Sequence, residues 1–195
     1  MSELTALTKG ELRRSLLTTR TTMPLEIWQA KSQQICQHLQ HFPLFTQSRT
    51  ILTYISVRQE PDLKALLPLR PQWGLSRCVG KALSWHVWLP DSSRALPPNK
   101  YGIPEPEAGS PLLSSDQVDL LLLPAVACDR QGYRLGYGGG FYDRLLSTPE
   151  WASIPTIGIT FDFAYLPQLP VDSWDLPLQA VCTERGVFPA SQLPV

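Results

Sequence analysis

The chain has 195 residues, a length typical of one domain, and we predict a single domain over residues 1–195. Its 17 lysines and arginines balance 17 aspartates and glutamates, so a formal net charge of zero gives no general attraction to nucleic acid or to an anionic membrane. The longest nearly apolar run, residues 120–128, is far shorter than the ~20 residues that a membrane-spanning helix needs. Charged residues interrupt positions 1–22 and argue against a secretory signal, so we expect a cytoplasmic monomer without nucleic-acid or membrane partners.

The spacing of apolar residues predicts helices alternating with short strands. Helical spacing covers residues 4–19 and 25–39, the second helix beginning after Pro24. Shorter helices are expected over residues 62–67, with Asp62 as cap, and 141–147. Strands are expected over residues 50–57, 83–89, 119–128 and 154–161, with a shorter one inside 180–188. Pro124 leaves the second half of the strand 119–128 open, because proline cannot donate to a sheet.

Helices that alternate with uniformly apolar strands favour a mostly parallel sheet covered on both faces. We therefore predict an α/β fold, a Rossmann-like three-layer α/β/α sandwich. Ligands of such sheets bind outside the carboxyl ends of the strands, so the loops that follow Val57 and Cys128 are the expected places for a site.

The four cysteines, at positions 36, 78, 128 and 182, are scattered and form no Cys-x-x-Cys pair. This spacing excludes an ordinary zinc site. Their even number leaves disulfides open, but without a secretory signal free thiols are favoured.

A glycine-rich loop lies between the strand predicted at 119–128 and the helix predicted at 141–147. Residues 132–140 hold five of the chain's 12 glycines, and Arg130, Arg134 and Arg144 lie in or beside the segment. Glycine lets backbone N–H groups approach a ligand closely, and the start of a helix adds unpaired amides. Together with the arginines, this pattern predicts a phosphate-binding loop, although a glycine triplet alone also occurs in ordinary turns.

Two familiar nucleotide motifs are excluded in this loop. No Gly-Lys-Ser/Thr follows the glycines, so there is no Walker A motif, and in a Gly-x-Gly-x-x-Gly count from Gly136 the last position is Phe141. Asp143 lies one turn into the helix. Its carboxylate suits a hard cation beside phosphate, or equally a surface acid at a helix N-terminus.

With these residues in view, the sequence RLGYGGGFYDR at positions 134–144 resembles the signature of the 5-formyltetrahydrofolate cyclo-ligase family, also called methenyltetrahydrofolate synthetases. The resemblance extends over nearly the whole chain, through residues 9–13 (KGELR), Glu60, residues 99–106 (NKYGIPEP), Leu169, Pro170 and Asp175.

The resemblance implies that ATP and Mg²⁺ drive ring closure of 5-formyltetrahydrofolate to 5,10-methenyltetrahydrofolate, with release of ADP and phosphate. Phosphorylation of the formyl oxygen makes it a good leaving group when N10 attacks the formyl carbon. Such phosphoryl transfer needs positioning and charge stabilisation more than a protein nucleophile.

The resemblance also implies site residues. For ATP these are Lys9, Leu12, Arg13, Arg134, Leu135, Gly136, Tyr137, Gly138, Gly139, Gly140, Phe141 and Tyr142. For the folate substrate they are Ile55, Glu60, Tyr101, Tyr137, Gly138, Gly139, Gly140 and Phe141. Lys9 and Arg134 are the expected catalytic cations that neutralise phosphate charge, and Asp143 is the expected ligand of Mg²⁺.

One part of the chain departs from the family pattern. Members often carry an acidic residue and then a histidine before the tail aspartate, and here Ser173 and Trp174 precede Asp175. If the tail acid is a metal ligand, Asp172 or Asp175 is left to supply it. The departure keeps open a non-catalytic nucleotide- or folate-binding relative. A sugar-phosphate isomerase or CoA-transferase of similar architecture rests on fold analogy alone.

Overall fold

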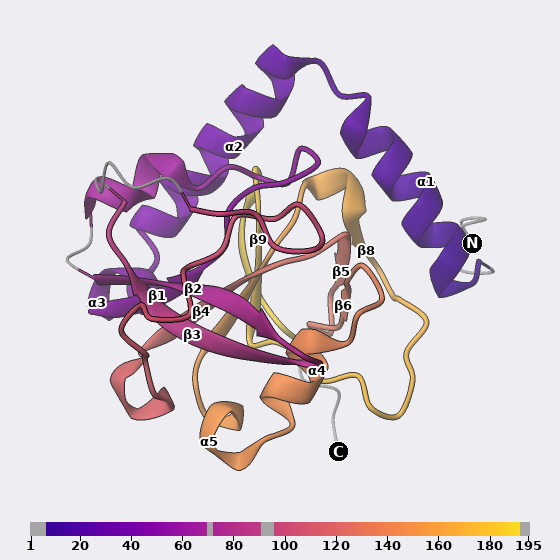
Figure 1. Ribbon diagram of the computed structural model, residues 1–195. Coiled ribbons are helices and arrows are strands. Elements are labelled where there is room, and N and C mark those ends of the chain that lie inside the picture. The colour runs from indigo at the N-terminus through magenta and orange to yellow at the C-terminus, as the bar shows by residue number, and fades with distance from the viewer. Residues whose placement is uncertain (1–6, 70–71, 91–95, 192–195) are drawn as a thin grey trace.

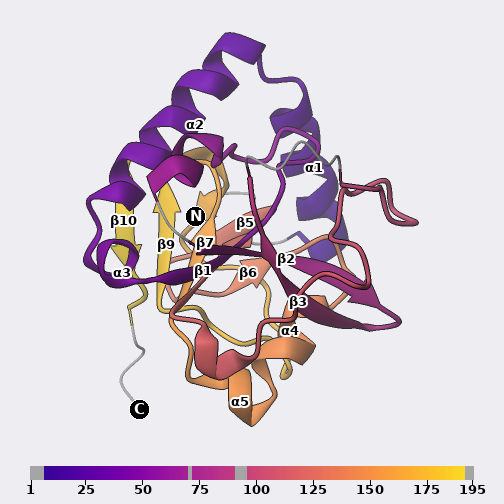
Figure 2. The same cartoon turned by 60° about the vertical axis from the view of Figure 1, so that its left-hand side comes forward.

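The computed structural model describes residues 7–69, 72–90 and 96–191 (Figure 1). A seven-stranded sheet in the order β10-β9-β7-β4-β1-β2-β3 forms the centre. Its inner strands pair in parallel, whereas β3 and β10 pair antiparallel to their neighbours at the two edges. The α2 helix lies on one face and α4 and α5 lie on the other (Figures 1 and 2), so the predicted three-layer, Rossmann-like α/β sandwich is confirmed.

The helices are α1 (Lys9–Thr21), α2 (Leu25–Gln40), α3 (Pro43–Gln47), α4 (Phe141–Leu146) and α5 (Pro149–Ala152), with 3-10 turns η2 (Lys64–Leu69), η3 (Ser115–Gln117) and η4 (Asp162–Ala164). The strands of the main sheet are β1 (Thr50–Thr53), β2 (Gln72–Val79), β3 (Ala82–Trp88), β4 (Leu120–Pro124), β7 (Thr156–Ile159), β9 (Ala180–Thr183) and β10 (Gly186–Pro189). A second, three-stranded sheet has the order β6-β5-β8, with β5 (Ala127–Asp129), β6 (Arg134–Leu135) and β8 (Tyr165–Leu166).

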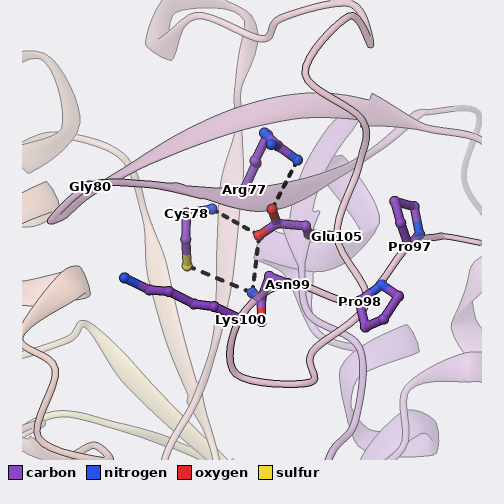
Figure 3. A pocket seen from close by; sticks show the side chains of 8 residues that line it. All are labelled: Arg77, Cys78, Gly80, Pro97, Pro98, Asn99, Lys100 and Glu105. Carbon is purple, nitrogen blue, oxygen red and sulfur yellow. Dashed lines mark hydrogen bonds and ion pairs between the residues drawn. The ribbon is translucent and has the colours of Figure 1, made fainter.

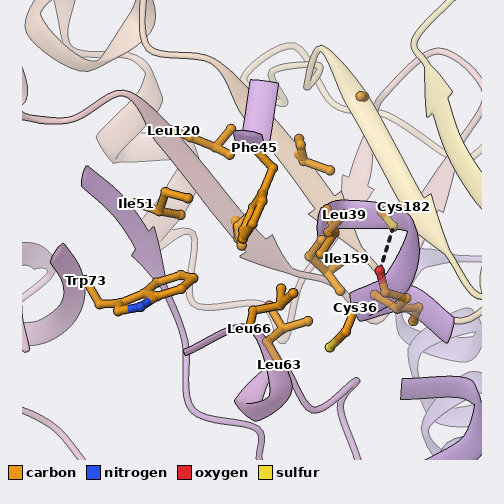
Figure 4. Close-up of a cluster of buried hydrophobic side chains, with 14 of the residues drawn as sticks. Cys36, Leu39, Phe45, Ile51, Leu63, Leu66, Trp73, Leu120, Ile159 and Cys182 are labelled. Atoms are coloured by element: carbon orange, nitrogen blue, oxygen red, sulfur yellow. Dashed lines mark hydrogen bonds between the residues drawn. The ribbon is translucent and has the colours of Figure 1, made fainter. Parts of the chain in front are cut away.

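The central strands are apolar on both sides because both faces of the sheet are covered. Ile51 and Leu120 contribute to a core under α2 (Figure 4), while Leu52 and Leu121 contribute to a core on the α4 and α5 side. All four side chains are fully buried, and each contributes about 1.5–3 kcal/mol by leaving water.

Pro124 ends the strand predicted over residues 119–128. The main sheet keeps β4, and after two residues the chain re-enters strand structure as β5 in the second sheet. Helix α1 packs on that second sheet, where Leu12 and Leu16 contact a cluster that includes Leu135. The departure of the chain at Pro124 therefore moves the glycine loop away from the plane of the main sheet and toward α1.

Other boundaries also differ from the sequence-based expectations. The strand predicted over 50–57 ends at Thr53, because the chain turns inward at residues 57–60. β2 and α3 were not predicted, and the segment 180–188 holds two antiparallel strands. Residues 7 and 8 of the first predicted helix precede α1, for which Thr8 is the cap, while its residues 4–6 lie outside the described residues. The helix predicted over 62–67 is the 3-10 turn η2, which begins at Lys64, and Asp62 precedes it with its Oδ1 accepting from the Lys64 amide at 3.1 Å. All four cysteines are free.

Candidate active site

The predicted site residues that follow β1 lie at the carboxyl ends of the central strands. Strand β1 has β2 as its neighbour on one flank and β4 as its neighbour on the other. The strand order therefore changes direction between β1 and β4. Such a switch point is the usual ligand position in a doubly wound sheet.

Glu60 is held inside the molecule by a tight turn after β1. Arg58 and Gln59 both have positive φ, at 49° and 55°, and the Glu60 amide donates to the Val57 carbonyl at 3.0 Å. Two consecutive non-glycine residues in the left-handed region are a local strain of order 1–3 kcal/mol each, which is typical of functional sites. The turn brings the Glu60 side chain inward, where only 2% of the residue is exposed.

Both oxygens of the Glu60 carboxylate have partners within the protein. Oε1 accepts from the Tyr137 hydroxyl at 2.9 Å, and Oε2 accepts from the Val57 amide at 3.1 Å. Burial raises the pKa of Glu60, while the positive charge of Arg20 and these two hydrogen bonds oppose the rise. Trp28 Nε1 also donates to the Glu60 carbonyl at 2.8 Å, so α2 fixes the backbone of this residue.

Tyr137 connects the glycine loop to Glu60 and to α1. Its hydroxyl donates to Glu60 and accepts a hydrogen bond from Arg20 Nη2. The guanidinium carbons of Arg20 and Arg58 lie 5.5 and 5.6 Å from the centre of its ring. The loop that was predicted to bind phosphate and the acid that was predicted to bind folate are therefore in direct contact.

Two arginines hold the glycine loop by hydrogen bonds to its backbone carbonyls. Arg13 Nε donates to the Gly136 carbonyl at 2.6 Å, and Arg144 Nη2 donates to the Gly139 carbonyl at 2.8 Å. Within the described residues, the backbone amides of positions 136–140 donate no hydrogen bond to other protein groups. With carbonyls held and amides available, the loop can accept an anion. Because α4 has only six residues, these amides matter more than its dipole.

Arg134 is paired rather than free. Its Nη2 donates to Asp143 Oδ1 at 2.7 Å, its Nη1 donates to the Leu176 carbonyl at 3.3 Å, and only 4% of its side chain is exposed. The Arg134–Asp143 ion pair joins β6 to α4, the two elements that flank the glycine loop. In this arrangement Arg134 orients Asp143 beside the loop.

Lys9 is held by two tail carboxylates. Its Nζ contacts Asp172 Oδ2 at 2.6 Å and also forms an ion pair with Asp175. Burial lowers the pKa of Lys9, but hydrogen bonds and charges from the two aspartates outweigh this effect and raise it overall. Trp174, between them in sequence, is 66% exposed. The Asp-Ser-Trp-Asp tail thus lies at the N-terminal end of α1.

Several predicted contact residues have their side chains in the core or only partly exposed. Leu12 and Leu135 are fully or almost fully buried in the cluster under α1. The Tyr142 ring contacts Trp85 and lies under the Arg134 guanidinium, and burial raises the pKa of its hydroxyl. Phe141 lies beneath Arg144, whose guanidinium carbon is 5.2 Å from its ring centre. These side chains shape the loop that carries the amides.

The structure places Ile55 and Tyr101 in different surroundings. Ile55 is half-buried in the segment between β1 and Glu60. Tyr101 is 53% exposed, on a loop that borders a cavity of about 410 Å³ at the carboxyl end of β2 (Figure 3). In that cavity Glu105 accepts from Arg77, from the Cys78 amide and from Asn99. Because β2 runs parallel to β1, the cavity opens on the same edge of the sheet as Glu60.

Two site residues were missed by the sequence prediction, Arg20 and Arg58. A signal for Arg20 exists, because positions 9, 13 and 20 fall within about 40° of one another on a helix of 3.6 residues per turn. The three cations thus share one face of α1. Arg58 has no comparable signal, since its position depends on a left-handed turn that its residue type does not indicate.

A magnesium ion fits the site only as a partner of bound phosphate. Within the described ranges, no group of three or more histidine, cysteine, aspartate or glutamate side chains could hold a metal by itself. Asp143 provides one carboxylate beside the loop, with one oxygen bonded to Arg134. Mg²⁺ is commonly bound by one or two carboxylates together with substrate phosphates, so this donor set is compatible with it.

A glycine loop with available amides beside a buried acid, at the switch point of a doubly wound sheet, is the arrangement of an α/β protein with a ligand-binding or active site at this edge. Comparison with known proteins narrows this class. The model of the 5-formyltetrahydrofolate cyclo-ligase family matches residues 6–184, and the chain belongs to this family of enzymes.

Similar relatives cover nearly all of the chain. The 5-formyltetrahydrofolate cyclo-ligase of Escherichia coli K12 is 30% identical over 179 residues, which cover 87% of this chain and 96% of the relative. The Mycolicibacterium smegmatis enzyme of the same name is 29% identical over 191 residues, covering 92% and 95%. The solved 5,10-methenyltetrahydrofolate synthetase of Aquifex aeolicus matches with a TM-score of 0.82 at 29% identity, covering 97% of this chain and 96% of that one.

The fold is shared with a further solved structure, the 5,10-methenyltetrahydrofolate synthetase of Mycoplasma pneumoniae, at a TM-score of 0.72 and 20% identity over 91% of this chain and 99% of that one. Among the helices of the described residues, none has the length and apolar character needed to span a bilayer.

Proposed function

We propose that the chain uses ATP and Mg²⁺ to close 5-formyltetrahydrofolate to 5,10-methenyltetrahydrofolate, releasing ADP and phosphate. The observation that carries the proposal is the hydrogen bond between Tyr137 of the glycine loop and Glu60. It supports a site in which terminal phosphates and a formyl oxygen meet, as transfer of a phosphoryl group between them requires.

On the phosphate side, the amides of residues 136–140 bind the terminal phosphates while Arg13 and Arg144 hold the loop carbonyls. Lys9 adds a positive charge. To contact a phosphate oxygen, its ammonium group must weaken or give up one of its ion pairs with Asp172 and Asp175. Arg134 acts through Asp143, which it keeps beside the loop. Leu12, Leu135 and Tyr142 support the loop by packing. These groups hold the phosphoryl group in line with its acceptor and stabilise the charge that develops on it.

On the folate side, Glu60 accepts hydrogen bonds from ring and amino N–H groups of the pterin, and both of its oxygens are acceptors only in the ionised form. Ile55, Tyr137 and the loop through Phe141 line the pterin position. Tyr101, on the exposed loop beside the cavity at β2, offers an aromatic face to a more distant part of the substrate.

Asp143 would hold Mg²⁺ together with phosphate oxygens, and Asp172 or Asp175 would serve as a second carboxylate if released by Lys9. When bound, the ion neutralises phosphate charge. A monomeric state and a cytoplasmic location belong to this proposal.

An absorbance assay for methenyltetrahydrofolate tests the proposal directly. Purified protein is mixed with 5-formyltetrahydrofolate, with ATP and Mg²⁺ together and with each left out in turn. We expect product only in the complete mixture. Binding of either ligand without any product would instead identify a non-catalytic relative, and product formed without ATP would refute the phosphorylation step.

A further inference from the structure

Arg20 is a buried cation that the proposed chemistry does not yet use. Only 2% of it is exposed, and its guanidinium donates to the Arg58 carbonyl at 3.1 Å, to the Ala125 carbonyl at 3.4 Å and to the Tyr137 hydroxyl. Within the described residues, no carboxylate forms a direct ion pair with it. A buried charge without a counter-charge is costly, so the nearby negative charge of Glu60 stabilises it through the intervening hydroxyl.

The path from Arg20 to Glu60 consists of two hydrogen bonds that share one oxygen. Arg20 donates to the Tyr137 hydroxyl, and this hydroxyl donates its own proton to Glu60 Oε1 at 2.9 Å. A guanidinium can only donate, so the Tyr137 oxygen accepts from Arg20 and the hydroxyl keeps its own proton for Glu60. Tyr137 therefore presents its proton toward Glu60, which favours the carboxylate over the carboxylic acid.

We infer that Arg20 is a positioning residue that acts through Tyr137 to keep Glu60 ionised and oriented for the folate. This inference rests on the proposed function and adds a residue on α1 to it. The buried position of Glu60 makes the ionised form costly, and Arg20 opposes that cost through the hydroxyl that both residues contact.

Charged and titratable groups from several elements face Glu60. The charged and titratable groups that interact with it are Arg20 from α1, Arg58 from its own turn, Tyr54 after β1, Tyr137 from the glycine loop and Tyr142 from α4. The tyrosines are neutral near pH 7, because burial raises the pKa of each one. Arg58 is exposed, so solvent screens it. Arg20 is thus the buried cation of this set.

The test is the pH dependence of kcat/KM for 5-formyltetrahydrofolate in Arg20→Gln, Arg20→Lys and the parent protein. We expect Arg20→Gln to move the acidic limb upward by about one pH unit and to raise the folate KM about tenfold at neutral pH, with the ATP KM unchanged. Arg20→Lys keeps the charge and should hold the limb near its parent position. Arg14→Gln removes an exposed charge from the same helix and serves as the matched control.

A double-mutant cycle with Tyr137→Phe tests the route. If Arg20 acts through the hydroxyl, the limb shift caused by Arg20→Gln shrinks in the Tyr137→Phe background; equal, additive shifts would overturn the inference. An unmoved limb in Arg20→Gln, or the same shift in Arg14→Gln, would also overturn it.

Two measures keep the test decisive. If thermal unfolding shows that Arg20→Gln does not fold, Arg20→Met fills a similar space without a polar group, and the same limb shift is expected. Folate binding without ATP, followed by tryptophan fluorescence against pH, reports on Glu60 independently of turnover. If the parent protein turns over normally and Arg20→Gln has the same acidic limb as the parent, only the role of Arg20 is refuted. If the parent shows no turnover, the proposed function is refuted.

Discussion

The two halves of the site differ in whether their polar groups already have protein partners. On the proposed folate side, both oxygens of Glu60 accept hydrogen bonds and the residue is buried. On the proposed phosphate side, the amides of residues 136–140 donate to no described protein group, while arginines hold the carbonyls. Under the proposed function, a folate must therefore share or replace existing bonds, whereas a phosphate adds new ones.

This difference makes the two halves separable by mutation. Changes on the folate side should alter the folate KM and the pH profile. Changes on the phosphate side should alter the ATP KM, the Mg²⁺ requirement and turnover.

The largest effect is expected for Arg134→Ala. It leaves Asp143 without its partner and frees the Leu176 carbonyl, so the order of the loop and of the tail is lost together. We expect turnover to fall on the order of a thousandfold and the free energy of unfolding to fall by about 1–3 kcal/mol, reduced from a fully buried pair because Asp143 is partly exposed. Steady-state kinetics and thermal unfolding measure the two effects. Arg49→Ala, at an exposed arginine to which no role in the site is assigned, is the control, and turnover equal to that of the control would contradict the prediction.

Glu60→Gln should come next, with an effect confined to the folate side. The substitution keeps the shape but removes the charge that accepts hydrogen bonds from the pterin and balances Arg20. A charge-assisted hydrogen bond contributes about 1.5–3 kcal/mol, so we expect the folate KM to rise about tenfold to a hundredfold with the ATP KM changed less than about twofold. Measuring both KM values checks this; equal effects on both would remove Glu60 from the folate half.

Asp143→Asn should have a smaller effect that appears as a metal requirement. The amide still accepts from Arg134, so folding is preserved, but it is a weaker ligand for a hard cation. We expect about tenfold more Mg²⁺ for half-maximal turnover, on the order of 1.4 kcal/mol. A Mg²⁺ titration with Asp116→Asn as the exposed control tests this, and overlapping titrations would exclude Asp143 as a ligand.

Gly138→Ala should have the smallest effect, on ATP alone. Gly138 has a φ of 98°, which an alanine adopts only with strain, and the added methyl group would lie 3.8 Å from the Arg13 guanidinium carbon. A local cost of about 1 kcal/mol should raise the ATP KM severalfold and leave the folate KM unchanged. Gly109→Ala, where φ is not positive and the space is open, is the control. If the two variants bind ATP equally well, the loop does not depend on this conformation.

The sequence predicted the fold class and the position of the glycine loop well, because each depends on residue type. Uniformly apolar strands indicate a covered sheet, and clustered glycines indicate exposed amides. Strand β2 was missed because Gly74, Ser76 and Arg77 interrupt its apolar pattern, and pairing with both β1 and β3 decides it instead.

Ion pairs between residues far apart in the chain could not be predicted from the sequence either. The sequence places Arg134 beside the glycine loop, and the resemblance assigns Lys9 to the same phosphate. Only the structure shows that both cations already form ion pairs with carboxylates. Apart from the resemblance, nothing in the sequence around Glu60 predicts that this acid is buried. Its burial depends on two left-handed residues, Arg58 and Gln59, whose types do not favour that conformation.

Helix α1 carries Lys9, Arg13 and Arg20 along one face, and they contact the tail, the glycine loop and the tyrosine beside Glu60, respectively. A helix rises about 1.5 Å per residue, so these three cations are distributed over roughly 16 Å of one continuous helix. Under the proposed function this one helix borders both ligand positions, and any coupling that it carries between them must be reciprocal, each ligand changing the affinity for the other by the same factor.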